Sequence, residues 1–320
     1  MSADGAALGA RLRERDLSAA PAALNLLEST APADLEQAAA LLGEVSPMAL
    51  GGEAPGHVIG VTGPPGAGKS TLLSALLHAW RSGGPPTRTA AVLAVDPSSR
   101  RSGGSLLGDR ARIEFDPADG GTLIRSSAAE QRLGGLARAT RVSADALAAA
   151  FDIVVIETVG VGQAETDVAD VADTVVVVVQ PGSGDVLQFL KSGIMETPDV
   201  LVVTKADLGQ IAMRARRDLT AALRSLGSRE TSVLAVSAVS PPSGIEELVA
   251  SLDEHRGELD IAERRVRARR AGALNDFSVE HGERGMRAVG GRRAAQALLA
   301  EQDPAADLPA LVAALEQRMG

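Results

Sequence analysis

The 320-residue sequence contains no cysteine. A chain without thiols has no disulfide framework and no thiolate metal site. Its four histidines, His57, His78, His255 and His281, are scattered along the chain, so a zinc or nickel centre is not expected.

The sequence also lacks a long apolar run. No stretch approaches the roughly 18 apolar residues that a membrane-spanning helix needs. The first twenty residues have no apolar signal core, and Asp4, Glu14 and Asp16 argue against an organelle transit peptide. The net charge of −9 gives a general nucleic-acid role little support, although it does not exclude a local basic patch. We therefore expect a cytoplasmic protein that binds neither membrane nor nucleic acid.

Lysine is scarce. Of 32 basic residues only three are lysines, namely Lys69, Lys191 and Lys205. Surface positions tolerate a drift toward arginine because either cation serves there. Lysine should persist where a compact ammonium on a flexible stem cannot be replaced by a planar guanidinium. Each of the three lies in a candidate site.

From His57 onward, short Val-rich runs alternate with helical patterns. Continuous apolar strands separated by helices predict an α/β fold with a mainly parallel sheet covered by helices on both faces. Residues 1–50 are predicted to form an N-terminal helical extension, 57–257 the α/β domain and 258–320 a C-terminal helical arm.

The stretch "GVTGPPGAGKST" (60–71) matches G-x-x-x-x-G-K-[ST] after an apolar strand and before a helix, which indicates a P-loop nucleotide-binding domain. Backbone N–H groups would surround the β-phosphate, Lys69 would neutralise β/γ oxygens, and Ser70 would bind Mg²⁺. The residues expected to bind the nucleotide here are Gly63, Pro64, Pro65, Gly66, Ala67, Gly68, Lys69, Ser70 and Thr71. The alternative, a Gly/Pro turn before a structural helix, is disfavoured by the complete match.

Three acids are candidate Mg²⁺ ligands, directly or through water. Asp96 ends one predicted strand, Asp109 lies in a Gly-rich loop, and Glu157 ends the strand "DIVVIET". Glu157 is also expected to take part in catalysis by polarising the attacking water. Either aspartate alone is also compatible with a cap or turn, and Glu157 with an ordinary strand-end acid.

Two further residues are candidates for hydrolysis. Gln163 follows Gly160 and Gly162 in a turn that could reach the γ-phosphate. Lys191 lies in a Gly-rich stretch that we interpret as a partner-dependent switch, with an exposed connecting helix as the alternative.

The stretch "LVVTKAD" (201–207) predicts base recognition. Asp207 can accept hydrogen bonds from guanine N1–H and the exocyclic amine, which adenine cannot offer, and the Lys205 stem can pack along the ring. The turn Ser237, Ala238 and Val239 is predicted to bind the base, with a backbone N–H of Ser237 or Ala238 directed at guanine O6. GTP and GDP are therefore predicted over adenine nucleotides, and 57–257 becomes a GTPase domain.

With "GPPGAGKST", "DPSSRRSGGSLLGD", "ETVGVGQ" and "TKAD" in this order, residues 10–320 closely resemble the MeaB/ArgK family. These P-loop GTPases are chaperones of adenosylcobalamin-dependent acyl-CoA mutases such as methylmalonyl-CoA mutase, and the methylmalonic aciduria type A proteins are relatives. The resemblance implies slow hydrolysis that the mutase accelerates, nucleotide-gated cofactor loading and protection of that mutase, and a homodimer formed by 258–320.

Three departures from the family pattern are expected to matter. Thr204 stands where the family usually has Asn, which should remove an amide that braces the phosphate loop. Arg100 and Arg101 add charge to a loop, and several glycines from 282 to 291 interrupt the C-terminal arm. Two other functions stay open: a kinase or ATPase linked to amino-acid transport, and a metallochaperone GTPase, which the missing cysteines disfavour.

Overall fold

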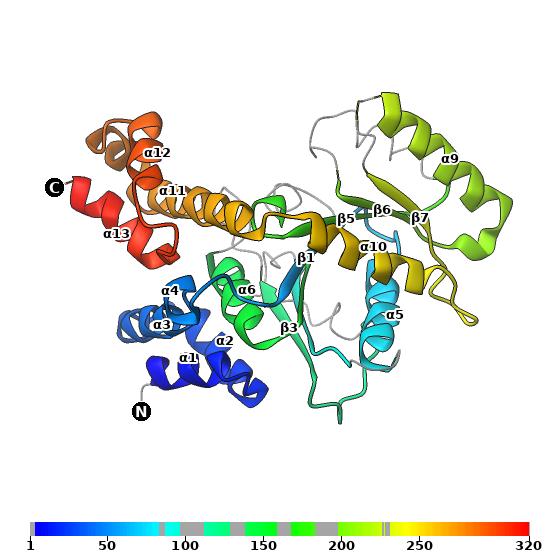
Figure 1. Cartoon of the computed structure of the whole chain (residues 1–320), viewed down its shortest axis with the longest axis horizontal. Helices are drawn as coiled ribbons and strands as arrows, with labels where there is room; N and C mark the ends of the chain where they lie inside the picture. Colours follow the sequence, from blue (N-terminus) through cyan, green and yellow to red (C-terminus); the bar gives the residue numbers. More distant parts are fainter. Residues whose placement is uncertain are drawn as a thin grey trace, which may run out of the picture. The chain divides into compact units, whose positions relative to one another are not determined.

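The structure is a computed structural model that describes residues 4–82, 87–96, 112–128, 138–158, 168–182, 198–225, 227 and 231–319 (Figure 1). The chain divides into two compact units. One comprises 57–136 and 153–259, and the other comprises 1–56, 137–152 and 260–320. The first is called the sheet unit and the second the helical unit.

The sheet unit is built on seven strands in the order β3-β2-β4-β1-β5-β6-β7, and every neighbouring pair is parallel. The strands are β1 (His57–Thr62), β2 (Ala90–Asp96), β3 (Thr122–Ala128), β4 (Ile153–Thr158), β5 (Thr174–Val179), β6 (Val200–Val203) and β7 (Ser232–Ala235). Strands β1, β4, β5 and β6 are buried at every position, as expected for apolar strands covered on both faces.

Helices cover both faces of this sheet. Helix α5 (Lys69–Ser82) and α10 (Ile245–Glu258) contribute Leu72, Leu76 and Leu248 to the core formed with the strands. Helix α9 (Gln210–Ser225) is amphipathic and buries residues such as Leu219. Two short 3-10 helices, η3 (Val168–Asp170) and η4 (Ala206–Leu208), complete the described part of the unit. The predicted α/β class and the parallel sheet are confirmed.

The strand order brings the predicted site residues to one edge of the sheet. Strand β1 lies between β4 and β5, and Val61 is opposite Glu157 in the register of β1 and β4. Ala94 of β2 is opposite Glu157 on its other side. Because the carboxyl ends of parallel strands meet at one edge, the loop after β1 and the acid of β4 are neighbours there, where open α/β sheets bind ligands.

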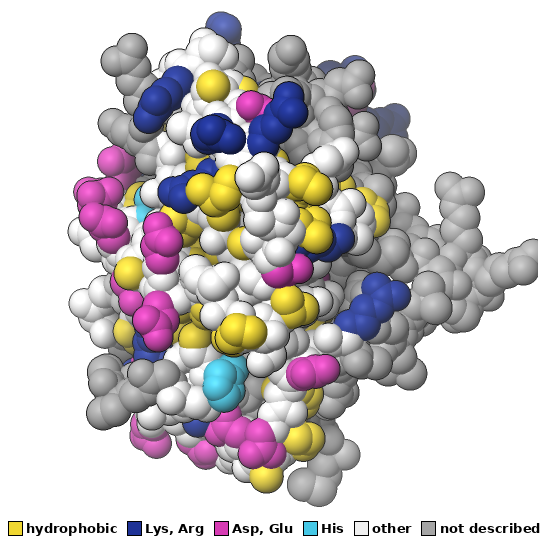
Figure 2. All heavy atoms as spheres, turned by 90° about the vertical axis from the view of Figure 1, so that its right-hand side faces the viewer, with side chains coloured by type: hydrophobic (Ala, Val, Ile, Leu, Met, Phe, Trp, Pro, Cys, Tyr) yellow, Lys and Arg dark blue, Asp and Glu magenta, His cyan; other side chains and the backbone are white. Residues whose placement is uncertain are grey.

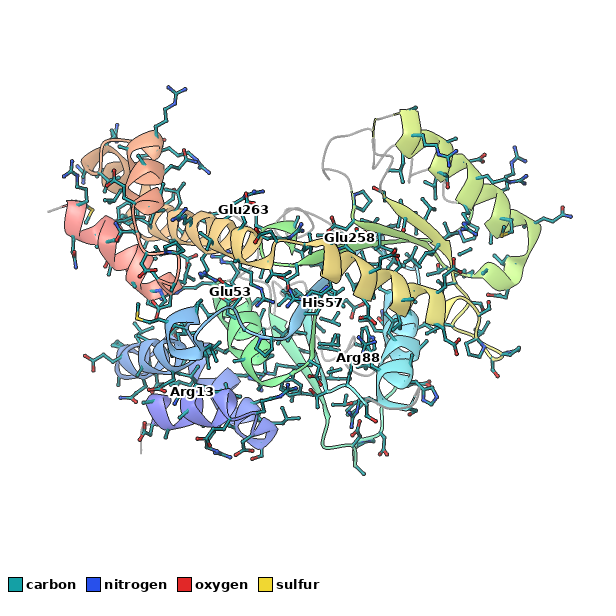
Figure 3. The ribbon with its side chains drawn as sticks, viewed as in Figure 1. Arg13, Glu53, His57, Arg88, Glu258 and Glu263 are labelled. Carbon is teal, nitrogen blue, oxygen red and sulfur yellow. The ribbon has the colours of Figure 1, made fainter. Side chains whose placement is uncertain are left out.

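The opposite edge carries a chain of polar side chains that no motif predicted. His57, labelled in Figure 3, contacts Thr174 Oγ1 through Nε2 at 2.7 Å. The same Oγ1 lies 2.8 Å from His255 Nδ1, and His255 Nε2 lies 3.3 Å from Asp199 Oδ1. Two histidines that are distant in sequence thus join β1, β5 and α10 through one hydroxyl.

The described residues of the helical unit contain helices and no strand. They form α1 (Gly5–Arg13), η1 (Leu17–Ala19), α2 (Ala20–Leu27), α3 (Pro32–Glu44), α4 (Pro47–Leu50), α6 (Arg138–Ala150), α11 (Ile261–Ala288), α12 (Arg292–Ala300) and α13 (Leu308–Met319). Helix α11 leaves helical geometry at Gly282, and Gly290 and Gly291, both with positive φ, separate it from α12. The domain boundaries predicted from the sequence include residues 138–150 in the α/β domain. In the structure, α6 belongs to the same compact unit as the terminal helices.

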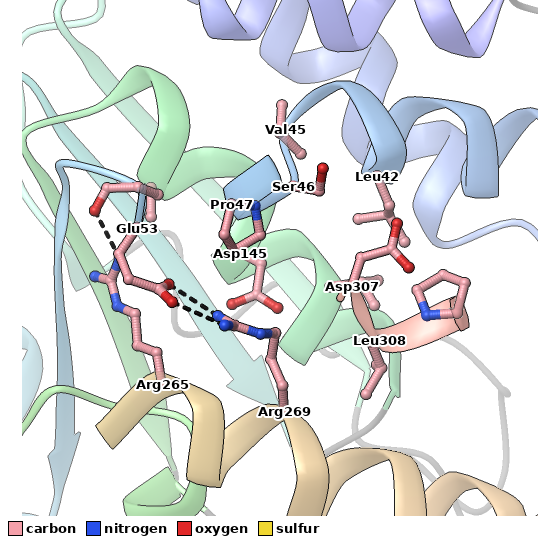
Figure 4. A pocket seen from close by; sticks show the side chains of 14 residues that line it. Leu42, Val45, Ser46, Pro47, Glu53, Asp145, Arg265, Arg269, Asp307 and Leu308 are labelled. Carbon is pink, nitrogen blue, oxygen red and sulfur yellow. Dashed lines mark hydrogen bonds and ion pairs between the residues drawn. The ribbon is translucent and has the colours of Figure 1, made fainter. Parts of the chain in front are cut away.

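Ion pairs fix α11 within this unit (Figure 4). Arg269 donates to both carboxylate oxygens of Glu53 at 2.8 Å, and Arg265 donates to the carbonyl oxygens of Ala54 and Gly56 at 2.6 Å. The cavity beside them measures about 40 Å³. A water molecule in liquid water takes up about 30 Å³, so the cavity is far too small for a nucleotide. Its charged groups therefore serve the fold.

The surface of the sheet unit has a local basic area despite the acidic composition. Helix α9, at the upper right of Figure 1, exposes Arg214, Arg217 and Arg224. Lys and Arg side chains gather in the upper part of the face shown in Figure 2, and Asp and Glu follow its left and lower margins. Among the described helices, none is both long and apolar enough to cross a membrane.

Candidate functional site

The loop between β1 and α5 depends on three glycines. Gly63, Gly66 and Gly68 have φ values of 141°, 76° and 90°. A Cβ at Gly63 would lie closer than 3.0 Å to Val178 O, so this position has no room for a side chain. Glycines with positive φ before a helix N-terminus allow successive backbone N–H groups to face one anion. The local geometry is that of a phosphate-binding loop.

Lys69 folds back over this loop. Its Nζ donates to Gly63 O at 2.7 Å and to Pro64 O at 3.3 Å, and the residue is only 7% exposed. An ammonium with three donors on a flexible stem can exchange these carbonyl oxygens for those of a phosphate. A planar guanidinium is less suited to donating several hydrogen bonds to oxygens grouped around one point. This difference accounts for a lysine at position 69 in an arginine-rich chain.

The side chains of Ser70 and Glu157 are in contact next to the phosphate loop. Ser70 Oγ donates to Glu157 Oε1 at 3.2 Å, and Glu157 is 5% exposed at the end of β4. A hydroxyl beside a carboxylate is a donor set that suits Mg²⁺, a hard cation that binds oxygen ligands. The residues present therefore fit a magnesium ion next to the phosphate loop.

Two threonines at the same edge strengthen this assignment. Thr62 is the last residue of β1 and Thr158 is the last residue of β4. The Oγ1 atoms of both are buried without a hydrogen-bond partner among the described residues. A buried hydroxyl normally has a partner, so such atoms at a ligand-binding edge are expected to meet a ligand, water or ion. Sequence reasoning missed both, although each directly precedes a glycine-rich turn or follows a predicted metal acid.

Other predicted residues are not placed by the structure. Asp96 ends β2, but only its backbone is described. Asp109, Gln163 and Lys191 lie outside the described residues. Their roles as metal ligand, water-positioning residue and switch remain predictions.

The loop that follows β6 brings the predicted base-reading residues together. Asp207 Oδ1 accepts a hydrogen bond from Ser237 Oγ at 2.9 Å, and Ala206 N donates to Val236 O at 3.1 Å. Lys205 has φ 55°, and its Nζ donates to Gln180 Oε1 at 2.5 Å. The segments "TKAD" and "AVSAVS" are therefore side by side, as the base-reading prediction requires.

The turn after β7 leaves one of the two predicted backbone N–H groups as a donor to guanine O6. Ser237 N donates to Ser243 O at 2.9 Å, so this amide has a partner within the protein. The predicted amide donor to O6 is therefore Ala238. Val239, the third predicted residue of the turn, is 53% exposed.

Thr204 contradicts the expectation that the phosphate loop has lost its brace. Its Oγ1 lies 2.6 Å from Ala67 O, a carbonyl of that loop, and 3.0 Å from Val179 O. The threonine hydroxyl thus makes the link that an asparagine amide was expected to make. The expectation failed because the Ala67 carbonyl comes close enough for a short side chain to reach.

A strongly perturbed acid lies elsewhere in the sheet unit. Hydrogen bonds from Arg81 hold the pKa of Asp119 well below its usual range, and Thr122 and the Gly121 N–H lower it further. Arg81 is in the last turn of α5, and Asp119 precedes β3. The pair joins helix and strand and has no part in the site.

Three proteins of known sequence are similar to this chain. A Mycobacterium tuberculosis protein named "Probable GTPase" is 43% identical over 272 residues, which cover 80% of this chain and 78% of the relative. GTPase ArgK of Escherichia coli is 39% identical over 201 residues, covering 62% of this chain and 58% of the relative. The mouse protein "Methylmalonic aciduria type A homolog, mitochondrial" is 40% identical over 209 residues, covering 63% of this chain and 49% of the relative.

A solved structure agrees with these similarities. The crystal structure of a LAO/AO transport system kinase has a TM-score of 0.63 and 27% identity, and the match covers 93% of this chain and 87% of that one. The family described as "Methylmalonyl Co-A mutase-associated GTPase MeaB" matches residues 19–283. With this match, and with the phosphate loop, Glu157 and the predicted base-reading residues at one end of the strands, the chain belongs to the MeaB family of GTPases.

Proposed function

We propose that the chain binds GTP and Mg²⁺ at the carboxyl edge of its sheet, hydrolyses GTP to GDP and phosphate, and uses the nucleotide state to gate cofactor loading and protection of an adenosylcobalamin-dependent acyl-CoA mutase such as methylmalonyl-CoA mutase. The observation that carries the GTPase part is the contact of Ser70 with Glu157 under a phosphate loop whose lysine is already folded inward. The mutase part is supported by the description of the matching family and the name of the mouse relative.

The phosphate end of the nucleotide would be held by residues 63–71. Lys69 would transfer its hydrogen bonds from Gly63 O and Pro64 O to β/γ-phosphate oxygens. Ser70 and Glu157 would hold Mg²⁺ directly or through water, with Asp96 and Asp109 as further predicted ligands. When bound, the metal would neutralise charge on the β- and γ-phosphates.

The guanine base would be read by Asp207. Its carboxylate accepts from two donors, and guanine offers two in N1–H and the exocyclic amine. The hydrogen bond from Ser237 Oγ holds the carboxylate in one orientation, so little side-chain freedom is lost when the base binds. The Ala238 N–H would meet O6, and Lys205 would pack its stem along the ring.

Hydrolysis would be slow in the isolated protein and faster with the partner. Gln163 would orient the attacking water once the partner orders its loop, and Lys191 would be the residue through which the partner acts. Residues 258–320 would form the homodimer, and the protein would act in the cytoplasm.

Calorimetry with GTP, GDP and ATP on the purified chain tests the nucleotide assignment. We expect binding of both guanine nucleotides, little binding of ATP, and loss of GTP binding in Lys69→Ala. The matched control is Arg214→Ala, which removes a cation from the exposed face of α9 and should leave affinity unchanged. Equal affinities for ATP and GTP would exclude the role given to Asp207.

A steady-state hydrolysis assay with and without purified methylmalonyl-CoA mutase tests the partner. The mutase should raise the rate for the wild type, and Lys191→Ala should keep the slow basal rate but lose the stimulation. An unchanged rate with mutase, together with no co-elution of the GTP-bound chain, would reject the chaperone part and leave the GTPase part standing.

A second candidate function is suggested by the similar structure titled as a transport system kinase. A kinase of this kind would transfer the γ-phosphate to an amino acid or a transport protein rather than to water. Incubation with γ-labelled GTP distinguishes the two functions, because label recovered only as inorganic phosphate supports the GTPase.

A further inference from the structure

Thr204 connects the base-reading loop to the phosphate loop. It directly precedes Lys205, is 6% exposed, and has two carbonyl oxygens within hydrogen-bond distance of Oγ1. A hydroxyl carries only one proton, so it donates fully to one of them. Which carbonyl receives this proton determines what Thr204 can still offer to a nucleotide.

The neighbouring contacts favour Ala67 O. Its distance to Oγ1 is 2.6 Å, against 3.0 Å for Val179 O. Val179 O already accepts the backbone N–H of Thr204 at 2.8 Å. Ala67 is fully buried, and a buried carbonyl without a donor is costly. The hydroxyl proton is therefore directed at the phosphate loop.

The other side chains of the base-reading loop have different places in the proposed complex. Lys205 would lay its stem along the face of the ring, with Nζ next to Gln180 Oε1 at 2.5 Å, and Asp207 is a carboxylate that accepts from Ser237. N7 is the next polar atom after O6 along the base edge, and it is an acceptor. An asparagine at 204 would differ, because its amide has two N–H groups and could donate to both Ala67 O and N7.

We infer that Thr204 is a specificity-determining residue that braces the phosphate loop at the expense of N7, so that the described residues recognise guanine through N1, the exocyclic amine and O6 and leave N7 without a side-chain donor. The inference rests on the proposed binding of GTP and narrows its base recognition. It also means that one short segment, residues 204–207, both contacts the phosphate loop through Thr204 and would read the base through Asp207.

The test uses 7-deaza-GTP, which has C–H in place of N7 and keeps every other polar atom of the base. Calorimetry on the full chain should give Kd values for GTP and 7-deaza-GTP that agree within about twofold for the wild type. In Thr204→Asn, GTP should bind about fivefold more tightly than 7-deaza-GTP, which corresponds to one added hydrogen bond of about 1 kcal/mol.

Two further variants test the brace separately. Thr204→Val keeps the shape but removes the proton, and should weaken GTP and 7-deaza-GTP equally, by about tenfold, because Ala67 O loses its donor. Thr204→Ser keeps the hydroxyl and should bind both nucleotides within about threefold of the wild type. The ratio of the two Kd values is a readout that a merely structural role of Thr204 would not change.

A wild type that prefers GTP to 7-deaza-GTP by tenfold would overturn the inference, as would a folded Thr204→Asn variant with an unchanged ratio. If Thr204→Asn does not fold, the wild-type ratio and the valine–serine comparison still decide. Failure of the proposed function looks different, because a chain that binds neither GTP nor 7-deaza-GTP, or binds ATP equally well, fails before N7 is tested.

Discussion

The two glycines at positions 63 and 66 of the phosphate loop allow a matched pair of substitutions. Both have positive φ, 141° and 76°, so alanine is strained at either position. They differ in their surroundings. A Cβ at Gly63 would come closer than 3.0 Å to Val178 O, which belongs to the backbone of β5, whereas a Cβ at Gly66 would meet no atom within 4 Å.

The expected magnitudes follow from this difference. Gly66→Ala should lower the free energy of unfolding by about 1–2 kcal/mol, the cost of left-handed backbone for an L-residue. Gly63→Ala carries a similar backbone cost and in addition pushes β1 away from β5, which adds about 1–3 kcal/mol as for other overpacked positions. The second variant should therefore be less stable by a margin well outside experimental error.

Urea denaturation without nucleotide, followed by far-UV circular dichroism, measures both variants. The measurement is made without ligand because alanine at either position could also disturb phosphate binding. Equal destabilisation of the two variants would refute the reasoning, since it would mean that the contact between Gly63 and Val178 does not limit the loop. A Gly63→Ala protein as stable as the wild type would refute it more directly.

Three further predictions concern the scaffold. Asp119→Asn should cost about 1 kcal/mol of unfolding free energy at pH 7. Because the Arg81 hydrogen bonds lower the folded-state pKa of Asp119 below its unfolded value of 3.8, the wild-type advantage is complete above pH 3.8 and should shrink as pH falls further, which urea titrations at pH 7 and pH 3 would show. Arg269→Met should cost about 3 kcal/mol because Glu53, 16% exposed, keeps a charge without its partner, and Glu53→Gln in the same chain should recover part of the loss in a double-mutant cycle. Thr174→Val should cost about 1–3 kcal/mol in thermal or urea unfolding, since one buried hydroxyl contacts two histidine rings, and a neutral result would show that the rings find other partners.

The sheet and the phosphate loop could be predicted because their signals are local. Exposing Val-rich runs such as 174–179 to water would cost free energy, so these runs are expected to form buried strands. The glycines of 63–68 are dictated by backbone geometry that only glycine adopts easily. Glu157 was predictable because it ends such a strand, and parallel strands present their carboxyl ends together.

The details that the sequence did not reveal depend on distances between separate segments. Whether Thr204 reaches Ala67 O is decided by how closely two loops approach each other, not by the residue type. The hydrogen bond from Ser237 N to Ser243 O depends on how the chain turns back on itself after β7. Thr62 and Thr158 look like ordinary strand residues until their burial at the ligand edge is known.

The placement of α6 limits how the protein can be dissected. A chain cut to residues 57–257 would retain this helix but lose every other element of the compact unit to which it belongs. Ten residues of α6 are buried, and Arg141 pairs with Asp276 of α11, so the fragment would expose an apolar helix face and would lack the Asp276 carboxylate that Arg141 contacts. Such a fragment is expected to aggregate. A shortened chain would have to keep both terminal segments, or replace α6 by another crossover segment long enough to return from the end of β3 to the start of the parallel strand β4.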